Sequence, residues 1–121
     1  MDLKRLPGRF TVCRLPDPAM LDLSREFYFV GRTDEELSLL CRTEDTPPGA
    51  TDRNDGWRGF RIEGVLDFSL VGILSAISGI LAGQGIGLFA VSTFNTDYVF
   101  VKEENFERAL SALSANGYRI V

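Results

Sequence analysis

Along residues 56–121, the spacing of apolar residues alternates between that of a strand and that of a helix. This order constrains the fold more than any other feature. Runs rich in β-favouring residues at 56–66, 86–94 and 96–102 predict strands, and the closing YRIV predicts another. Helical spacing follows the first and the third of these runs. The predicted order is therefore strand, helix, strand, strand, helix, strand.

Each predicted helix has one apolar stripe with recognisable ends. The first stripe is Leu70, Ile73, Leu74, Ile77, Ile80 and Leu81, between an N-cap at Ser69 and the glycines Gly83 and Gly85. The second is Phe106, Ala109, Leu110 and Leu113, between Glu103-Glu104 and Asn116-Gly117. Two one-striped helices cover one face of a sheet. We therefore predict an α+β fold, a ferredoxin-like βαββαβ domain with a four-stranded antiparallel sheet.

The first half of the chain predicts a smaller, β-rich unit. Strands are expected at 9–15, 25–32 and 36–42, and residues 43–56 form the clearest loop, since they contain almost nothing apolar. We therefore place a β-rich unit at 1–55 and the βαββαβ domain at 56–121.

The strand at 98–101 is apolar at every position, which indicates burial on both faces of the sheet. The helices can cover only one of them. Either the N-terminal strands or a second copy of the chain must cover the other. This pattern and the short chain lead us to expect a homodimer or a higher oligomer.

Composition excludes several classes of function. The net charge is −4, from 13 Lys and Arg against 17 Asp and Glu, and the arginines are scattered, which counts against nucleic acid. The absence of histidine removes the commonest general base and metal ligand, and we expect neither a metal nor a cofactor. The start of the chain lacks the apolar core of a secretory signal, and the apolar stretch at 68–91 is interrupted by Ser and Gly. We expect a soluble cytoplasmic protein.

The two cysteines, Cys13 and Cys41, each lie within an apolar strand-like run. Buried reduced thiols are the simplest interpretation, because free cysteine is among the most buried residue types. A disulfide and a nucleophile are the alternatives, but no Cys-x-x-Cys pair supports a redox or zinc motif.

The segment GVLDFSLVGILSAISGILAGQGIGLFAVSTFNTDYVFV resembles the ACT domain, a small-molecule-binding module of amino-acid metabolism. More narrowly, it is similar to small bacterial ACT-domain proteins and to the cytosolic arginine sensors built from tandem ACT domains. The most specific part of the match is STFNTDY followed by a hydrophobic strand. The N-terminal half, with LPGRFTVCRLP and GRTDEELSLLC, resembles an abbreviated ACT-like unit with a short turn in place of the first helix.

The resemblance implies a ligand site where the first β-α loop meets the second strand, at an interface between modules. The residues carried over are Phe68, Ser69, Leu70, Val71 and Gly72 in the loop, and Thr93, Phe94, Asn95, Thr96 and Asp97 after the strand. In the arginine sensors, a Thr-Phe pair and an Asp three residues beyond the Phe contact the ligand. The chemistry agrees, because a helix N-terminus favours an α-carboxylate and Asp97 would hold a cationic group.

Structural explanations for these residues stay open. The residue types of Thr93, Asn95 and Thr96 are also common in turns. Ser69 can serve simply as an N-cap, without contacting a ligand. Asp97 can pair with a neighbouring arginine instead of a ligand. The glycines of GQGIG at 83–87 follow a helix, which is the wrong context for a dinucleotide loop.

The expected function is therefore that of a non-catalytic regulatory module that senses a free amino acid. The alternative is a structural or dimerisation module with no ligand, because a fold does not fix a function. An enzyme is disfavoured, since no nucleophile motif or metal cluster accompanies the missing histidine. Any signal would have to pass through a partner protein or a change in assembly.

Overall fold

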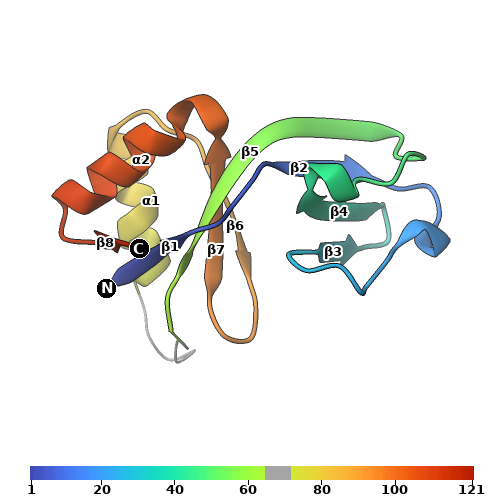
Figure 1. The fold of residues 1–121 in the computed structure, drawn as a ribbon, viewed down its shortest axis with the longest axis horizontal. Coiled ribbons are helices and arrows are strands. Elements are labelled where there is room, and N and C mark those ends of the chain that lie inside the picture. The colour runs from blue at the N-terminus through green and yellow to red at the C-terminus, as the bar shows by residue number, and fades with distance from the viewer. Residues whose placement is uncertain (65–71) are drawn as a thin grey trace. The chain divides into compact units, whose positions relative to one another are not determined.

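The computed structural model describes residues 1–64 and 72–121 of the chain, which form two compact units. The N-terminal unit comprises Gly8–Trp57, and the C-terminal unit combines Met1–Pro7 with Arg58–Val121 (Figure 1). One long strand, β5 (Asp52–Ile62), contributes residues to both units. No helix in the described part of the chain is long and apolar enough to cross a membrane.

The C-terminal unit has the predicted βαββαβ order, from β5 through α1, β6, β7 and α2 to β8. Its strands lie in the order β8 (Arg119–Ile120), β1 (Asp2–Arg5), β5, β7 (Asp97–Lys102) and β6 (Phe89–Ser92). Strand β1 pairs antiparallel with β5, with Leu3 opposite Ile62, and parallel with β8, with Asp2 opposite Arg119. The α+β class is confirmed, but the predicted four-stranded antiparallel sheet is wrong. An unpredicted strand, β1, lies between β5 and β8.

Both helices, α1 (Ile73–Gly83) and α2 (Glu103–Ala115), cover the same face of this sheet (Figure 1). The stripe predicted for α2 is fully confirmed, since Phe106, Ala109, Leu110 and Leu113 are its buried residues. In α1, Ile77 and Leu81 are buried, while Ile73, Leu74 and Ile80 pack partly buried against the same core. The predicted N-cap, Ser69, and the first stripe residue, Leu70, lie outside the described residues.

The opposite face of this sheet is covered at Phe100, in the middle of β7. Phe100 is fully buried within the single chain, as is Leu6. The Phe100 ring stacks on the ring of Phe89. It also lies close to Gly59, since a Cβ added to Gly59 would be 2.6 Å from Cε1 of Phe100. The apolar run at 98–101 is therefore buried on both faces as predicted, and at Phe100 no second copy is needed to bury it.

The N-terminal unit is a sheet in the order β3 (Phe29–Arg32), β4 (Leu37–Arg42), β2 (Phe10–Arg14) and the first half of β5. Short 3-10 turns, η1 (Pro18–Met20) and η2 (Thr43–Asp45), occupy the two places where the C-terminal unit has helices. The strand predicted at 25–32 begins only at Phe29. The loop predicted at 43–56 is also wrong in part, because η2 opens it and β5 starts at Asp52.

The predicted domain limits, 1–55 and 56–121, stay a prediction. Strand β1 belongs to the compact C-terminal unit although it precedes the N-terminal one in the sequence. Leu3 of this strand is fully buried in the helix-covered core, next to residues of β5 and α2 in the same cluster.

Candidate functional site

The predicted polar site at 92–97 forms the hairpin between β6 and β7. The backbone N–H of Thr93 donates to the carbonyl of Thr96 at 2.9 Å, and the Thr93 hydroxyl donates to the same carbonyl at 3.0 Å. The backbone N–H of Thr96 donates in turn to the Thr93 hydroxyl at 3.4 Å. Thr93 therefore closes the turn with its side chain, which removes the need for a glycine in this tight connection.

A second hairpin, 60 residues earlier, has the same construction. Between β3 and β4 the backbone N–H of Thr33 donates to the carbonyl of Glu36 at 2.9 Å, and the N–H of Glu36 donates to the Thr33 hydroxyl at 3.2 Å. The two threonines occupy equivalent places, although the other turn residues differ. The structural interpretation of Thr93 as a turn former is thus confirmed.

Thr96 and Asp97 are held by different partners. The buried hydroxyl of Thr96 donates to the carbonyl of Ile62 in β5 at 2.7 Å. The half-buried carboxylate of Asp97 accepts a 2.6 Å hydrogen bond from the hydroxyl of Ser92, its cross-strand neighbour. Among the described residues no arginine or lysine pairs with Asp97, so the alternative of an arginine partner gains no support.

Two residues at the tip of this hairpin project outward. Phe94 is 81% exposed, and Asn95 is exposed beside it. Exposure of an isolated apolar residue is ordinary in itself. The prediction that Phe94 and Asn95 contact a ligand therefore stays a prediction.

The other half of the predicted site is the start of α1. Phe68, Ser69, Leu70 and Val71 lie outside the described residues. Gly72, the residue before α1, has a left-handed backbone with φ of 82°, which explains why glycine stands there. Its carbonyl accepts the first helical hydrogen bond, from Ala76 N–H at 2.8 Å.

An open pocket of about 420 Å³ lies at this helix start. It is lined by Met1, Gly72, Ile73, Ala76, Asn116, Gly117 and Tyr118. No described side chain caps the helix at Gly72. The first N–H groups of a helix lack intrahelical partners and carry partial positive charge, so this rim favours an anionic group.

The described residues therefore form two groups rather than one. Gly72 lines the pocket, while none of the hairpin residues 92–97 is among its lining residues. The joint site stays a prediction. Sequence reasoning missed the contributions of Ala76 and Tyr118, and it read Asn116-Gly117 only as the end of α2. Nothing local in the sequence indicates that this helix end meets the start of α1.

The cysteines do not contribute to either group. Cys13 and Cys41 are buried and reduced, on β2 and β4 of the N-terminal unit, as the simplest interpretation predicted. Burial raises the pKa of the Cys41 thiol to about 11 and also raises the pKa of Cys13. At neutral pH both are protonated and therefore poor nucleophiles.

The fold defines a class: an α+β protein with a βαββαβ unit and a second unit that keeps the strand order but replaces both helices by short turns. More particularly, the chain belongs to the ACT domain family, which matches residues 52–115. No curated protein matches the chain.

Three solved structures are similar to this chain. Protein Atu0741 from Agrobacterium tumefaciens is 31% identical, with a TM-score of 0.86 over 99% of this chain and 91% of that one. Protein VC0802 from Vibrio cholerae, described as a possible transport protein, is 22% identical, with a TM-score of 0.73 over 92% and 85%. The ligand-free regulatory subunit of aspartate kinase from Thermus thermophilus is 13% identical, with a TM-score of 0.60 over 89% and 92%. The last two relationships concern the fold alone.

Proposed function

We propose that this chain is a non-catalytic regulatory module that binds a free amino acid at the start of α1. The observation that carries the proposal is the pocket of about 420 Å³ at a helix N-terminus that no described side chain caps, in a member of the ACT domain family. Its volume lies within the range of small-molecule sites. The N–H groups at the helix start would receive the α-carboxylate of the amino acid.

Asp97 is proposed to hold the cationic group of the same amino acid. Among residues 1–64 and 72–121 its carboxylate has one hydrogen-bond partner, Ser92, and therefore retains acceptor capacity. The fold shared with a protein described as a regulatory subunit of aspartate kinase supports a regulatory role. Such a module would act on a separate protein or through its assembly.

The test is a thermal-shift and calorimetric screen with each of the twenty standard L-amino acids. A ligand that binds only the folded state stabilises it by roughly 2.7 kcal/mol at a hundredfold excess over its dissociation constant. We expect one amino acid, or a chemically related group of them, to raise the melting temperature. The alternative function, a structural or dimerisation module with no ligand, predicts that none of the twenty does.

Two alanines on α1 provide a matched pair of variants. Ala76 lines the pocket and Ala82 does not, and both are exposed. Ala76→Leu should fill the pocket and remove the ligand-induced shift, whereas Ala82→Leu should leave it intact. Leucine fits a helix well, so neither change strains the backbone. Gly72→Val is a poorer probe, because φ of 82° strains any branched side chain.

Asp97→Asn tests the second contact. It keeps the size of the side chain and its bond to Ser92 while removing the charge. Binding should weaken by roughly 1.5–3 kcal/mol, the usual contribution of a hydrogen bond to a charged group. The melting temperature of the unliganded variant should stay close to that of the wild type. Unchanged affinity would exclude Asp97 from the site.

A homodimer is the assembly that we propose for this module. Among the described strands, β3 and β6 each pair on one side only, and an unpaired edge can accept another strand. Because Phe100 is fully buried within one chain, the apolar run at 98–101 no longer argues for a dimer. The proposal therefore rests on the unpaired edges of β3 and β6. Sedimentation at micromolar concentration should give a species of twice the 13.4 kDa chain mass, and a purely monomeric species would overturn it.

A further inference from the structure

The two units of this chain have sheets of one plan but unequal cover. Strand order is β3, β4, β2, β5 in the N-terminal unit, and β6, β7, β5, β8 follow the same order in the C-terminal unit, with β1 inserted before β8. In the C-terminal unit, α1 buries two of its residues and α2 buries four. The turns η1 and η2, which take the places of these helices, bury none. The N-terminal sheet is therefore covered less completely.

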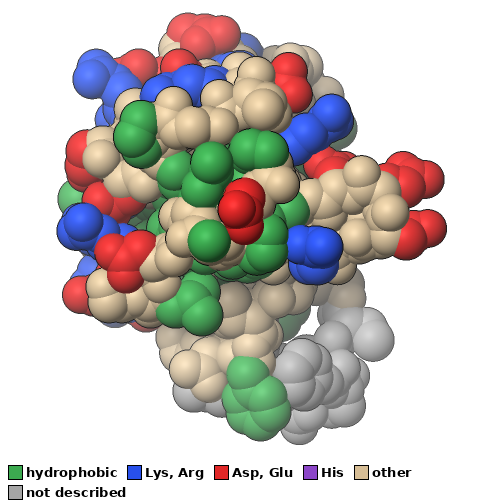
Figure 2. Space-filling model, turned by 90° about the vertical axis from the view of Figure 1, so that its right-hand side faces the viewer, with side chains coloured by type: hydrophobic (Ala, Val, Ile, Leu, Met, Phe, Trp, Pro, Cys, Tyr) green, Lys and Arg blue, Asp and Glu red, His purple; other side chains and the backbone are tan. Residues whose placement is uncertain are grey.

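The face on which η1 and η2 lie has a small core of its own. Its buried members come from β2, β4 and the residue after β2: Cys13, Leu15, Leu37, Leu39 and Cys41. The apolar side chains that pack on this core stay half-buried: Met20, Leu21, Tyr28 and Ala50. Figure 2, which views the N-terminal unit end-on, shows hydrophobic side chains gathered in the middle of the displayed face.

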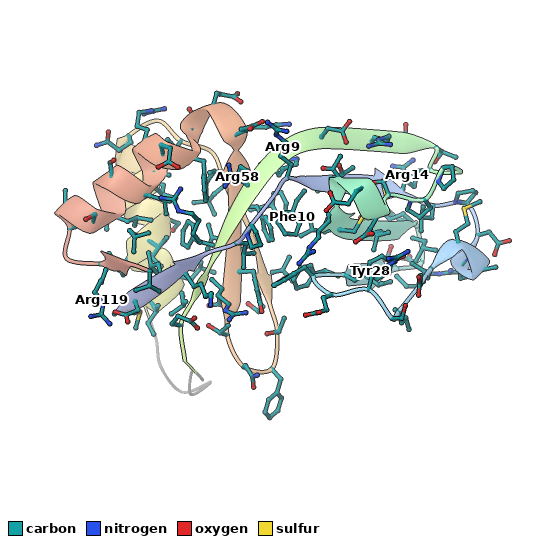
Figure 3. All side chains as sticks on the ribbon, viewed as in Figure 1. Arg9, Phe10, Arg14, Tyr28, Arg58 and Arg119 are labelled. Carbon is teal, nitrogen blue, oxygen red and sulfur yellow. The ribbon has the colours of Figure 1, made fainter. Side chains whose placement is uncertain are left out.

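Strand β3 extends this apolar surface to the edge of the sheet. Val30 lies directly opposite Leu39 of the small core, and residues paired in this way point to the same face. Val30 is 40% exposed. Tyr28, just before β3 (Figure 3), accepts a 3.0 Å hydrogen bond at its hydroxyl from the backbone N–H of Asp22. We define the half-covered face as Met20, Leu21, Tyr28, Val30 and Ala50.

The unit that carries this face also carries the whole net charge of the chain. Residues 8–57 contain six arginines, no lysine and ten Asp and Glu residues, whereas the C-terminal unit has seven of each sign. In Figure 2, acidic and basic side chains surround the hydrophobic ones. Arg25 pairs with Asp22 at 3.2 Å and with Asp45 of η2 at 3.8 Å. The exposed Glu44, also of η2, forms no ion pair with a described residue.

Charge and shape together indicate what can cover the half-covered face. Two copies that met at this face would bring two acidic units together, and like charges across an interface oppose binding. A basic partner would be attracted instead. The C-terminal unit shows the shape that covers a sheet of this plan, which is an amphipathic helix. Its apolar stripe packs on the sheet and its polar side faces water.

We propose that the half-covered face is a docking surface for a basic amphipathic helix of another protein. The apolar stripe of that helix packs on Tyr28, Val30 and the side chains beside them, and its lysines or arginines lie near the acidic groups of the N-terminal unit. The docked helix adds the layer that η1 and η2 do not complete. The surface does not depend on whether the pocket at α1 binds an amino acid.

The experiment uses the full chain and a fluorescein-labelled synthetic peptide of leucine and lysine. The peptide has about 18 residues, enough to form a helix, with its leucines at helical spacing on one stripe. One control peptide has glutamate in place of lysine, and another has the same composition with the leucines scattered around the helix. Fluorescence anisotropy should show at least about tenfold tighter binding of the lysine peptide than of either control. Equal binding of a control, or no binding of the lysine peptide, would overturn the proposal.

Two valine variants locate the binding. Val30 and Val121 are 40% and 51% exposed and lie in different units. Val30→Lys removes an apolar contact from the half-covered face and adds a cation to it, so it should weaken binding of the lysine peptide by about tenfold or more. Val121→Lys makes the same change of charge elsewhere and should leave the affinity nearly unchanged. Equal effects of the two variants, or no effect of either, would contradict the assignment. Circular dichroism verifies that both are folded.

Mapping on the wild-type chain gives a readout that needs no variant. When unlabelled lysine peptide is added, the largest changes in the ¹H–¹⁵N NMR spectrum should fall at residues 20–30 and 44–50. Changes concentrated at 72–121 would overturn the docking surface and leave the proposed amino-acid site untouched. Sedimentation tests the rival occupant. If Val30→Lys converts a dimer into a monomer, a second copy covers this face and the proposal is wrong.

Discussion

At the scale of single residues, the polar side chains of the β6–β7 hairpin have distinct roles. Thr93 closes the turn, Thr96 fastens the turn to β5, and Ser92 binds the carboxylate of Asp97. Only Thr96 is buried, because its hydroxyl meets the carbonyl of Ile62 inside the sheet. A polar turn can thus be explained largely by the fold, and Asp97 remains the residue with capacity for a ligand.

Thr96→Val should therefore destabilise the protein more than other changes in this hairpin. Valine keeps the shape but leaves the Ile62 carbonyl without the hydroxyl, and an unsatisfied buried polar group costs about 1–3 kcal/mol. Urea unfolding followed by circular dichroism measures this loss. Asn95→Ala is the control, because Asn95 is exposed in the same turn and its side chain makes no hydrogen bond with a described residue; such a change stays within about 0.5 kcal/mol. Equal effects of the two variants would contradict the assigned role of Thr96.

The buried thiols predict a specific dependence of stability on pH. Burial raises the pKa of Cys41 from 9.0 to about 11, so above pH 9 the unfolded chain releases a proton that the folded chain retains. The free energy of unfolding should be unaffected by this group below pH 9 and should fall as the pH rises from 9 to about 11. Urea unfolding at several pH values measures the slope.

The variant Cys41→Ala isolates this effect. Lysines and tyrosines also titrate in the same pH range, so only the difference between wild type and variant is diagnostic. The variant should lose less stability than the wild type over this interval. Parallel curves for the two proteins would show that Cys41 does not titrate differently on folding.

At the scale of elements, sequence analysis predicted the helices and strands that have a strong local pattern. The stripe and both ends of α2 were predicted because four buried residues recur at helical spacing. Strand β1 was not predicted, since DLKR has one apolar residue and depends on neighbours distant in sequence. The first part of β5 was taken for a loop, because residues 52–55 are polar and exposed and pair there with β2 alone.

The candidate site was predictable only in part for the same reason. The turn at Thr93 and the glycine before α1 are local features, and the sequence contains both. The pocket at α1 also needs Asn116, Gly117 and Tyr118, which reach it only through the packing of α2 and β8. Such a meeting of distant segments leaves no periodic signal in the sequence.

Gly59 of β5 shows how an element can depend on a missing side chain. A Cβ at this position would lie 2.6 Å from Cε1 and 2.7 Å from Cδ1 of the buried Phe100 ring. We expect Gly59→Ala to destabilise the protein by about 1–3 kcal/mol, as overpacking of a core does. Urea unfolding measures the loss, and adding Phe100→Leu should restore part of it.

Gly31→Ala is the matched control for this prediction. Gly31 also lies in a strand, β3, but its added Cβ would meet only the Cβ of Ser38, at an ordinary 4.0 Å. The change should be nearly neutral or slightly stabilising, because alanine loses less conformational freedom on folding. If Gly31→Ala costs as much as Gly59→Ala, the ring of Phe100 is not the cause.

At the scale of the whole molecule, the C-terminal unit depends on the first residues of the chain. Strand β1 separates β5 from β8, and Arg119 of β8 makes an ion pair with Asp2 at 2.6 Å. This pairing lowers the pKa of Asp2 and raises that of Arg119. Arg119 is exposed and Asp2 is half-buried at the surface, so the buried Leu3 contributes more to the stability of the pairing than the charges do.

Leu3→Ala and Lys4→Ala test this dependence at adjacent positions. Leu3 is fully buried in the core and Lys4 points to solvent, although both lie in β1. Leu3→Ala should cost about 2–5 kcal/mol, the usual loss for a large core residue. Lys4→Ala should change the free energy of unfolding by less than about 0.5 kcal/mol. A small effect at Leu3 would show that β1 is dispensable.

The parallel pairing of β1 with β8 also sets the order of events while the chain is being made. Asp2 and Arg119 are 117 residues apart, so at about 5–20 residues per second β1 precedes its partner by roughly 6–23 seconds. Even after β5 has paired with one edge of β1, the other edge stays unpaired until β8 has been made. Unpaired edges invite aggregation, and charged side chains, lysine above all, protect against it. In β1, the charged residues Asp2, Lys4 and Arg5 surround the single apolar Leu3. They would protect the unpaired edge from aggregation until β8 has been synthesised.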